Sequence, residues 1–448
     1  MCLASAGLAE AQSSPVTIRE AVEQAAKNYP AIRASMSDVT AAESGIDLAK
    51  TAYLPRADFH YQVNRATRNN IFGLTFPNPV IAPISGPAGE DQVGTSTFGA
   101  AVGLAFRWEP FDLGLRKSLV ALADRIRARA AAGQYVTEYE VSLAAADAFF
   151  NALAARQAVT AARANVERME VFAATVGALV RAELRPGADE SRAQAELAQA
   201  RNELIAVERL EHDQRLLLGR WMGTAGTEVE IAPGALLSDP PAFEEAAANL
   251  TGHPVAAAQA ANIDVVRALR ESIAKEYRPR FEVLSTVYGR GTGARLDGTF
   301  QGGGNGLVPN IGNWAVGFGV SFPVFDYKQN QVRREIESHR ETAEGARLEE
   351  ILESLESEVA QARVSVDAAR RIAANTPTQL AAAQMLERQA QARYQAGLGT
   401  VVEVADAQRL LRQAETDDAL AKLGIWRALF ALEAAEGDLT DILARGSR

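Results

Sequence analysis

The sequence Tyr53-Leu54-Pro55-Arg56 recurs as Tyr277-Arg278-Pro279-Arg280, and Asn28-Tyr29-Pro30 recurs at the same offset of 224 residues as Gly252-His253-Pro254. Further along the chain the offset becomes 214 residues. It relates Trp108-Glu109-Pro110-Phe111-Asp112 to Phe322-Pro323-Val324-Phe325-Asp326, Ala193-Gln194 to Ala407-Gln408, and Gly223 to Gly437. Two constant offsets over about 200 residues indicate a duplicated chain. The change of offset between residues 57 and 108 predicts a loop that differs in length between the halves.

Each half is predicted to contain the same elements in the same order. A helix over 17–52 or 243–276 precedes two strands joined by a loop, and a very long helix, a short break and another helix follow. The predicted boundaries are a signal-peptide remnant or disordered N-terminus (1–14), repeat 1 (15–223), a linker (224–242), repeat 2 (243–437) and a C-terminal tail (438–448). Ala9-Glu10-Ala11 before Gln12 fits the small-x-small pattern of a signal-peptide cleavage site.

A period of two residues marks the strands. Between Thr97 and Trp108, and again between Asn313 and Phe322, large apolar side chains alternate with small or polar ones. Strands of about ten residues with one apolar face are typical of a membrane β-barrel that faces lipid. A soluble sandwich also has alternating strands, but it needs more strands per helix than this chain offers. A third strand alternates in the same way, with Phe59, Tyr61 and Val63 between Asp58, His60, Gln62 and Asn64.

A period of three and four residues marks the long helices. No proline interrupts the stretch from Leu113 to Ala182, which as one helix would span roughly 100 Å. Pro377 lies inside the second long helix and predicts a kink or break, because it removes a donor and clashes with the preceding turn. A free coiled coil without a channel is the alternative, and the intervening strands argue against it. The predicted seams are Tyr139, Leu143, Ala146, Phe150 and Leu153, and Leu348, Leu352, Leu355, Val359, Ala362, Val366, Ala369 and Ala373.

Composition and motif content exclude several classes of function. The net charge of −10 argues against a nucleic-acid partner, because a basic face would be needed to neutralise phosphates. The four histidines and the single cysteine stand at no metal-ligand spacing, and no nucleophile elbow or phosphate loop is present. We therefore expect no metal, no cofactor, no nucleic-acid partner and no enzymatic activity. No run of about 18 apolar residues predicts a transmembrane helix.

Four strands per chain cannot close a barrel by themselves. An open sheet edge in lipid leaves unpaired backbone groups, so several chains must pool their strands. The predicted fold is therefore mainly α with a membrane β-barrel part: two tandem repeats, long antiparallel helical hairpins and four strands per chain. Trp108, Trp314 and Phe322 are expected to form the aromatic girdle of the barrel at the membrane interface.

The segment from Arg393 to Gln408 (Arg-Tyr-Gln-Ala-Gly-Leu-Gly-Thr-Val-Val-Glu-Val-Ala-Asp-Ala-Gln) contains an arginine, a glycine turn, two apolar residues and an acid. It resembles the helix–turn–helix tip of the TolC family of outer-membrane efflux proteins. Residues 15–437 follow the duplicated plan of that family, and the sister tip is Glu183–Asp189. The resemblance implies a homotrimer in the bacterial outer membrane, with a shared 12-stranded β-barrel and a periplasmic helical barrel.

The resemblance also implies function and partners. Such a trimer is a passive exit duct of a tripartite efflux or type I secretion system, and efflux is favoured by a small margin. Its tips meet a periplasmic adaptor (membrane fusion) protein that links the duct to an inner-membrane pump, and its barrel contacts outer-membrane lipid. A coiled-coil scaffold of the envelope without a pore is the alternative. The implied adaptor-binding residues are Leu184, Arg185, Gly187, Asp189, Arg393, Gly397, Leu398, Gly399 and Thr400.

Glu403, Asp406 and Tyr394 match the family's periplasmic entrance. The two acids are three residues apart, so both can lie on one face of a helix. Around a trimer axis they would form two rings of negative charge that favour cations. The alternative is two solvated acids in the first turn of a helix, where the dipole favours them. A basic residue of the family's closed-entrance lock corresponds to Gly399, and a usual glycine of the first tip corresponds to Glu183, so the lock and the adaptor fit are expected to differ.

Overall fold

The computed structural model describes residues 15–67, 96–240, 249–293, 295, 299 and 301–447. The predicted N-terminal remnant 1–14 and residues 68–95, where the loop of differing length was predicted, lie outside the described residues. The chain divides into two compact units. The helical unit comprises Met1–Val39, Ala130–Ala261 and Gly345–Arg448, and the strand unit comprises Thr40–Arg129 and Asn262–Glu344.

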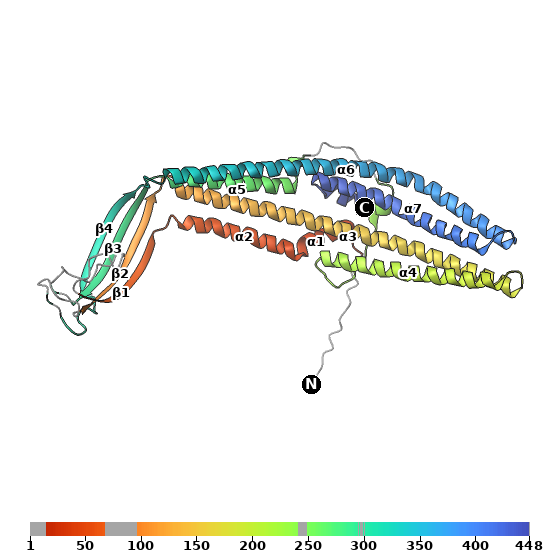
Figure 1. The fold of residues 1–448 in the computed structure, drawn as a ribbon, viewed down its shortest axis with the longest axis horizontal. Helices are drawn as coiled ribbons and strands as arrows, with labels where there is room; N and C mark the ends of the chain where they lie inside the picture. The colour runs from red at the N-terminus through yellow and green to blue at the C-terminus, as the bar shows by residue number, and fades with distance from the viewer. Residues whose placement is uncertain are drawn as a thin grey trace, which may run out of the picture. The chain divides into compact units, whose positions relative to one another are not determined.

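The strand unit contains a four-stranded antiparallel sheet (Figure 1). Its strands are β1 (Arg56–Thr67), β2 (Ser96–Phe111), β3 (Arg280–Thr292) and β4 (Ile311–Ser321), in the order β1-β2-β3-β4. The central pair, β2 with β3, joins the two halves of the duplication. β1 and β4 therefore each have one described neighbour, and the sheet has two open edges.

The register divides the sheet into an apolar and a polar face. Phe59 lies opposite Leu104, Leu104 opposite Val287, and Val287 opposite Trp314, so one row of the apolar face crosses all four strands. The row two residues away on β1, through Tyr61 and Val102, belongs to the same face. Large side chains of this face are exposed, which is the exposure expected of a surface that lipid covers. The polar face carries Arg56, Asp58, His60, Gln62, Ala105, Arg107, Thr286, Ala315 and Gly317.

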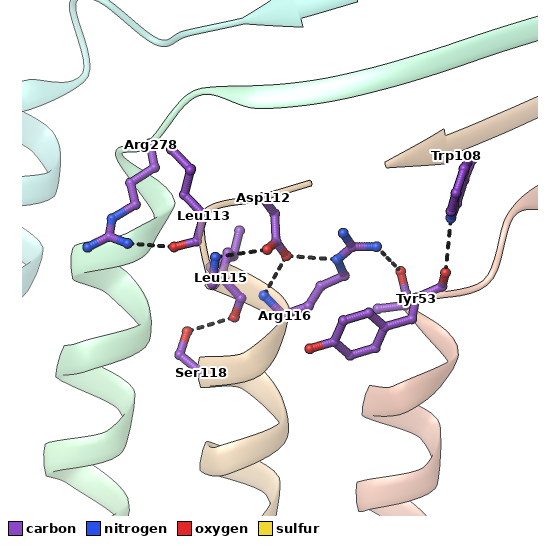
Figure 2. A network of polar contacts seen from close by, with 10 residues as sticks. Tyr53, Trp108, Asp112, Leu113, Leu115, Arg116, Ser118 and Arg278 are labelled. Carbon is purple, nitrogen blue, oxygen red and sulfur yellow. Dashed lines mark hydrogen bonds and ion pairs between the residues drawn. The ribbon is translucent and has the colours of Figure 1, made fainter. Parts of the chain in front are cut away.

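A buried ion pair fixes the chain where β2 passes into a helix (Figure 2). Asp112 accepts hydrogen bonds from the backbone N–H of Gly114 (2.9 Å) and of Arg116 (2.7 Å), and from Nε of Arg116 (2.7 Å). Arg116 Nη1 donates to the carbonyl of Ala52 at 3.2 Å, and its guanidinium lies 4.7 Å from the centre of the Tyr53 ring. Burial raises the pKa of Asp112, but the hydrogen bonds from Arg116 and Gly114 outweigh it and hold that pKa below its ordinary value.

The same junction bends through a left-handed residue. Leu113 has φ 51° and Gly114 has φ 91°, and the carbonyl of Leu113 accepts from Arg278 (Figure 2). Trp108 Nε1 donates to the carbonyl of Tyr53 at 3.2 Å. These contacts tie β2 to the ends of the neighbouring helices within the strand unit.

Two helical hairpins dominate the fold, and each turns back on itself in Figure 1. α3 (Leu115–Arg181) is followed by α4 (Gly187–Trp221), and α6 (Tyr327–Gln395) by α7 (Val401–Glu436). The shorter helices are α1 (Ile18–Asn28), α2 (Pro30–Thr51), α5 (Pro254–Glu276) and α8 (Thr440–Gly446), with 3-10 turns at Gly234–Leu237 and Leu250–Gly252. None of the helices in the described part of the chain is long and apolar enough to cross a membrane.

The predicted heptad seams form the core of the helical unit. Phe150 and Leu153 of α3 are fully buried and pack in one cluster with Val359 and Val366 of α6. The α6 seam continues past its predicted end in steps of four and three. The continuation is Thr376, Leu380, Ala383, Glu387, Ala390 and Tyr394, each buried or half-buried.

Of the kink or break predicted at Pro377, the break is wrong, because α6 runs through this residue without interruption. A proline at this position leaves the carbonyl four residues earlier, that of Ala373, without its N–H donor. Thr376 Oγ1 donates to that carbonyl at 3.4 Å. Thr376 is itself a buried seam residue, so packing and this substitute hydrogen bond together stabilise the helix across the proline.

The first predicted helix, 17–52, is two helices. Pro30 begins α2, and Tyr29 before it is extended, with φ −65° and ψ 131°. A residue that precedes proline avoids the helical region, so α1 ends here. In the second half α5 begins at Pro254, and residues 243–248 of the predicted helix 243–276 lie outside the described residues. The predicted C-terminal tail contains α8, which buries Ile442 in the core.

Candidate functional site at the two helix turns

The turn between α6 and α7 is built around Gly397, whose φ is 80°. The carbonyl of Arg393 accepts from the N–H of Leu398 at 2.9 Å and of Gly399 at 3.1 Å, which closes the end of α6. Thr400 caps α7, because its side chain accepts from the backbone N–H of Glu403. The glycine turn and the cap make this a rigid reversal of the chain.

The turn between α3 and α4 has a different construction. Glu183 occupies the left-handed region with φ 59°, the conformation that explains a glycine at this place in the related family. The N–H of Leu184 donates to the carbonyl of Leu179 at 2.9 Å. Pro186 is the N-cap of α4 and gives no side-chain hydrogen bond, while Asp189 lies in the first helical turn.

Three of the predicted residues come together where the two turns meet. Tyr394, only 1% exposed, donates from its hydroxyl to Asp189 Oδ2 at 3.0 Å. The guanidinium of Arg185 stacks 4.3 Å from the centre of the Tyr394 ring and also donates to the Tyr394 carbonyl. Phe172 of α3 packs edge-on against the same ring, with centroids 5.8 Å apart. We call Arg185, Asp189 and Tyr394 the tip latch.

The tip latch keeps Tyr394 protonated. Burial raises the pKa of Tyr394 to about 12, the hydrogen bond to Asp189 and its negative charge add to that rise, and the charge of Arg185 opposes it. At physiological pH the hydroxyl is therefore a hydrogen-bond donor and Asp189 its acceptor. The sequence predicted these residues separately, and their contact joins positions 205 residues apart. The residue numbers of Asp189 and Glu403 differ by the repeat offset of 214, so these two acids occupy equivalent positions in the two turns.

Glu403 and Asp406 lie on one face of α7 and line a groove of about 750 Å³ against α6. Glu403 Oε2 lies 3.8 Å from Nε of Arg393, and Asp406 lies 3.2 Å from Arg409. Both carboxylates are about half exposed or more, and each faces an arginine of its own chain. Leu386 and Leu410 add apolar surface to the groove.

The remaining tip residues lie at the ends of the hairpins. Leu184 is 69% exposed and Leu398 is 71% exposed, so both turns present an apolar side chain to solvent. Gly187 has open space around it, whereas a Cβ at Gly399 would lie 3.2 Å from Arg393 Cβ. Among the described residues no group of three or more His, Cys, Asp or Glu side chains could hold a metal ion.

The chain matches a known family over most of its length. The sequence profile described as "Outer membrane efflux protein" covers residues 21–224 and 250–438. The chain belongs to this family. As an outer membrane efflux protein it is an outer-membrane exit duct with its helical part in the periplasm. The predicted location, function and fold class, two repeats of helical hairpins with four strands per chain, are confirmed.

Solved channels share the fold of this efflux protein at low sequence identity. The outer-membrane channel OprN is 19% identical with a TM-score of 0.73, covering 94% of this chain and 89% of that chain. CusC is 15% identical with a TM-score of 0.76, covering 94% and 92%. The open state of MtrE from Neisseria gonorrhoeae is 18% identical with a TM-score of 0.72, covering 96% and 91%. No curated protein sequence matches significantly.

The predicted girdle residues of this efflux protein do not share one level of the sheet. Trp108 lies near the helical end of β2, and Phe322 directly follows β4. Trp314 lies opposite Val287, whereas Trp108 lies opposite Val283. The two tryptophans are thus four residue steps apart along the strands, about 13 Å. Trp314 stands within the apolar band and Trp108 at its edge.

Proposed function

We propose that this exit duct is a homotrimer that exports solutes passively from the periplasm to the exterior, with no catalytic chemistry of its own. Three copies, the number that the family resemblance implies, pool twelve strands and satisfy the open edges of β1 and β4. A periplasmic adaptor protein docks on the two helix turns and links the duct to an inner-membrane pump. Efflux is favoured over type I secretion as its task.

The tip latch is the observation that supports a gated entrance. It joins α3–α4 to α6–α7 at their turns through a tyrosine, an acid and a stacked arginine. Opening the entrance by moving one hairpin away from the other breaks these contacts. A hydrogen bond to a charged acceptor contributes about 1.5–3 kcal/mol. A docked adaptor can offset a cost of that size with a modest interface, so the latch suits a duct that partners open.

Glu403 and Asp406 are the proposed selectivity residues of this entrance. Their carboxylates lie side by side on the exposed face of α7, one helical turn beyond the α6–α7 turn. Three copies around an axis place six carboxylates at the entrance, which favour the passage of cations. The exposed Leu184 and Leu398 give the turns an apolar surface for the adaptor.

Conductance in planar bilayers tests the proposal. The purified, detergent-extracted protein is compared with Glu403→Ala/Asp406→Ala and with a matched control, Glu353→Ala/Glu356→Ala. The control removes two exposed acids that are also three residues apart, on α6 and outside the groove. We expect small, cation-selective steps in the native protein and the control, and loss of that selectivity in the entrance variant.

A Tyr394→Phe variant tests the latch in the same measurement. It keeps the ring and removes the hydroxyl that donates to Asp189, so we expect a larger open fraction with unchanged ion selectivity. Cation selectivity that survives Glu403→Ala/Asp406→Ala contradicts the acidic entrance but is still consistent with a duct. A protein that gives no steps and stays in solution without detergent contradicts the duct, and supports the scaffold alternative.

A further inference from the structure

The polar face of the sheet holds two arginines in direct opposition. Arg56 of β1 and Arg107 of β2 are cross-strand partners, so their side chains leave the sheet side by side on the same face. Like charges directly opposite each other destabilise a strand pair. Both residues are exposed, and neither forms an ion pair or hydrogen bond with any side chain in the described part of the chain. The opposition occurs in a chain whose net charge is −10.

The duplication shows that the fold does not need this pair. By the repeat offsets, Arg56 corresponds to Arg280 and Arg107 corresponds to Ser321. Arg280 and Ser321 are themselves cross-strand partners, so the second half builds the same position with one arginine and one serine. The same backbone frame therefore accepts serine where the first half has Arg107. The fold does not require the positive charge of Arg107. That charge therefore indicates a negatively charged ligand.

The surroundings fit a small oxyanion. Arg107 lines a hollow of about 410 Å³ on the polar face, together with Asp58, His60, Leu284, Thr286 and Ala315. Asp58 is the nearest carboxylate on β1, in the next row of the face, and forms no ion pair with either arginine in the described residues. Two arginines that leave the same face side by side, one of them in a hollow with the Thr286 hydroxyl and the His60 imidazole, offer the donors that phosphate, sulfate or carboxylate accept.

We propose that Arg56 and Arg107 form an oxyanion-binding site on the inner wall of the duct, near the helical end of the sheet. The inference rests on the proposed function, because the polar face lines the lumen only if the apolar face of the assembled strands meets lipid. Solutes that carry a phosphate, sulfate or carboxylate group then pause at this site during export. In a trimer the site occurs three times around the wall.

Block of the single-channel current by inorganic phosphate tests the site. We expect phosphate, at matched ionic strength against chloride, to reduce the current through the native duct. Arg107→Ser, which copies the second half, is expected to raise the half-blocking phosphate concentration by about tenfold, the loss of one charge-assisted hydrogen bond, and Arg56→Gln/Arg107→Ser is expected to raise it further. Ser321→Arg, which places a second arginine opposite Arg280, is expected to strengthen the block.

Arg65→Gln is the matched control. Arg65 lies on the same strand but on the opposite face, where it stacks on Phe98 with 5.1 Å to the ring centre and donates to Ser96 at 2.9 Å. Its removal costs the same single charge and is expected to leave the phosphate block unchanged. If single-channel steps are seen and phosphate blocks the native protein, Arg107→Ser and Arg65→Gln equally, the oxyanion site is overturned and the duct is not. Absence of steps in every variant overturns the proposed duct instead.

Discussion

At the scale of single residues, His253 connects two ends of the second repeat. Its Nδ1 accepts from the N–H of Val255 at 3.3 Å, so Nε2 carries the proton and faces the Tyr139 hydroxyl, also at 3.3 Å. That hydroxyl donates to the carbonyl of Ala434 at 2.5 Å. A Cβ on Gly437, whose φ is 88°, would lie 2.8 Å from the imidazole. The neutral imidazole therefore packs directly against Gly437, where a side chain would clash with it.

This geometry predicts loss of stability in mild acid. Burial lowers the pKa of His253 below its ordinary value, against the opposing contributions of the Ala434 carbonyl and Glu358. The folded protein then binds fewer protons than the unfolded chain, so stability is fully present above the unfolded pKa of about 6.5 and falls as pH decreases below it. We expect the Tm in detergent to fall across this window, and His253→Gln to flatten the fall.

His212→Gln is the control for that prediction. His212 lies outside the core, where it contacts Glu228 at 3.0 Å, so its replacement is expected to leave the contribution of His253 to the fall of the Tm unchanged. Parallel curves for native protein, His253→Gln and His212→Gln would show that other groups determine the acid response.

At the scale of elements, the two strand-to-helix junctions have the same frame and different chemistry. Arg116 corresponds through the offset of 214 to Asn330. Arg116 neutralises buried Asp112, whereas Asn330 donates from its amide to the carbonyl of Ile273 at 2.5 Å. Removal of one partner from a buried ion pair costs about 3–5 kcal/mol, and loss of one neutral hydrogen bond about 1 kcal/mol.

The predicted order of Tm in detergent is therefore native, then Asn330→Ala, then Arg116→Ala. Arg116→Lys is expected to fall between the last two, because it restores the charge without the fork that reaches both Asp112 and Ala52. A Tm for Arg116→Ala at or above that of Asn330→Ala would mean that the buried pair contributes no net stability to the junction.

Sequence patterns predicted some features of these elements correctly and others incorrectly. Alternation along Phe59, Tyr61 and Val63 gave the correct strand and face, since one exposed apolar surface constrains every second residue. The heptads gave the correct seam, because close helix packing imposes the same period over many turns. The break predicted at Pro377 was wrong, because the local rule does not include the neighbouring hydroxyl of Thr376 that replaces the missing donor.

The candidate site was predicted only in part. The residues of both turns were predicted from the resemblance to the TolC family, but the bond from Tyr394 to Asp189 was not. That bond depends on how two hairpins more than 200 residues apart pack, and no local pattern encodes such a contact. Asp189 and Glu403 are equivalent acids of the two repeats, which shows that the turns correspond but not that the turns are in contact.

At the scale of the whole molecule, the even number of strands decides how copies can join. In the order β1-β2-β3-β4 with every pair antiparallel, β4 runs opposite to β1. A neighbouring copy that places its β1 beside β4 therefore continues the antiparallel pattern without a change of direction. The seam between copies then has the same hydrogen-bond geometry as the pairs inside one chain. Closure into a shared barrel adds no new kind of strand pairing.

Cysteine cross-linking tests this seam, because Cys2 is the single cysteine of the chain and Cys2→Ser gives a clean background. One cysteine replaces Asp58, His60 or Gln62 on the polar face of β1, and a second replaces Asn313 or Ala315 on β4. Edge strands that pair between copies in a register that opposes these positions bring at least one combination within disulfide distance. We expect that combination to give covalent dimers and trimers on oxidation, and no larger species, since a closed ring of three has no free edge.

The control pair replaces Ala105 and Thr286, which lie opposite each other on β2 and β3. It is expected to form a disulfide within one chain and to leave the protein monomeric under denaturing conditions. Edge pairs that remain monomeric throughout, while the control oxidises, would exclude pairing of β1 with β4 between copies. A ladder that continues beyond three would instead indicate an open, heterologous array, because only a closed assembly limits the length of the chain of cross-links.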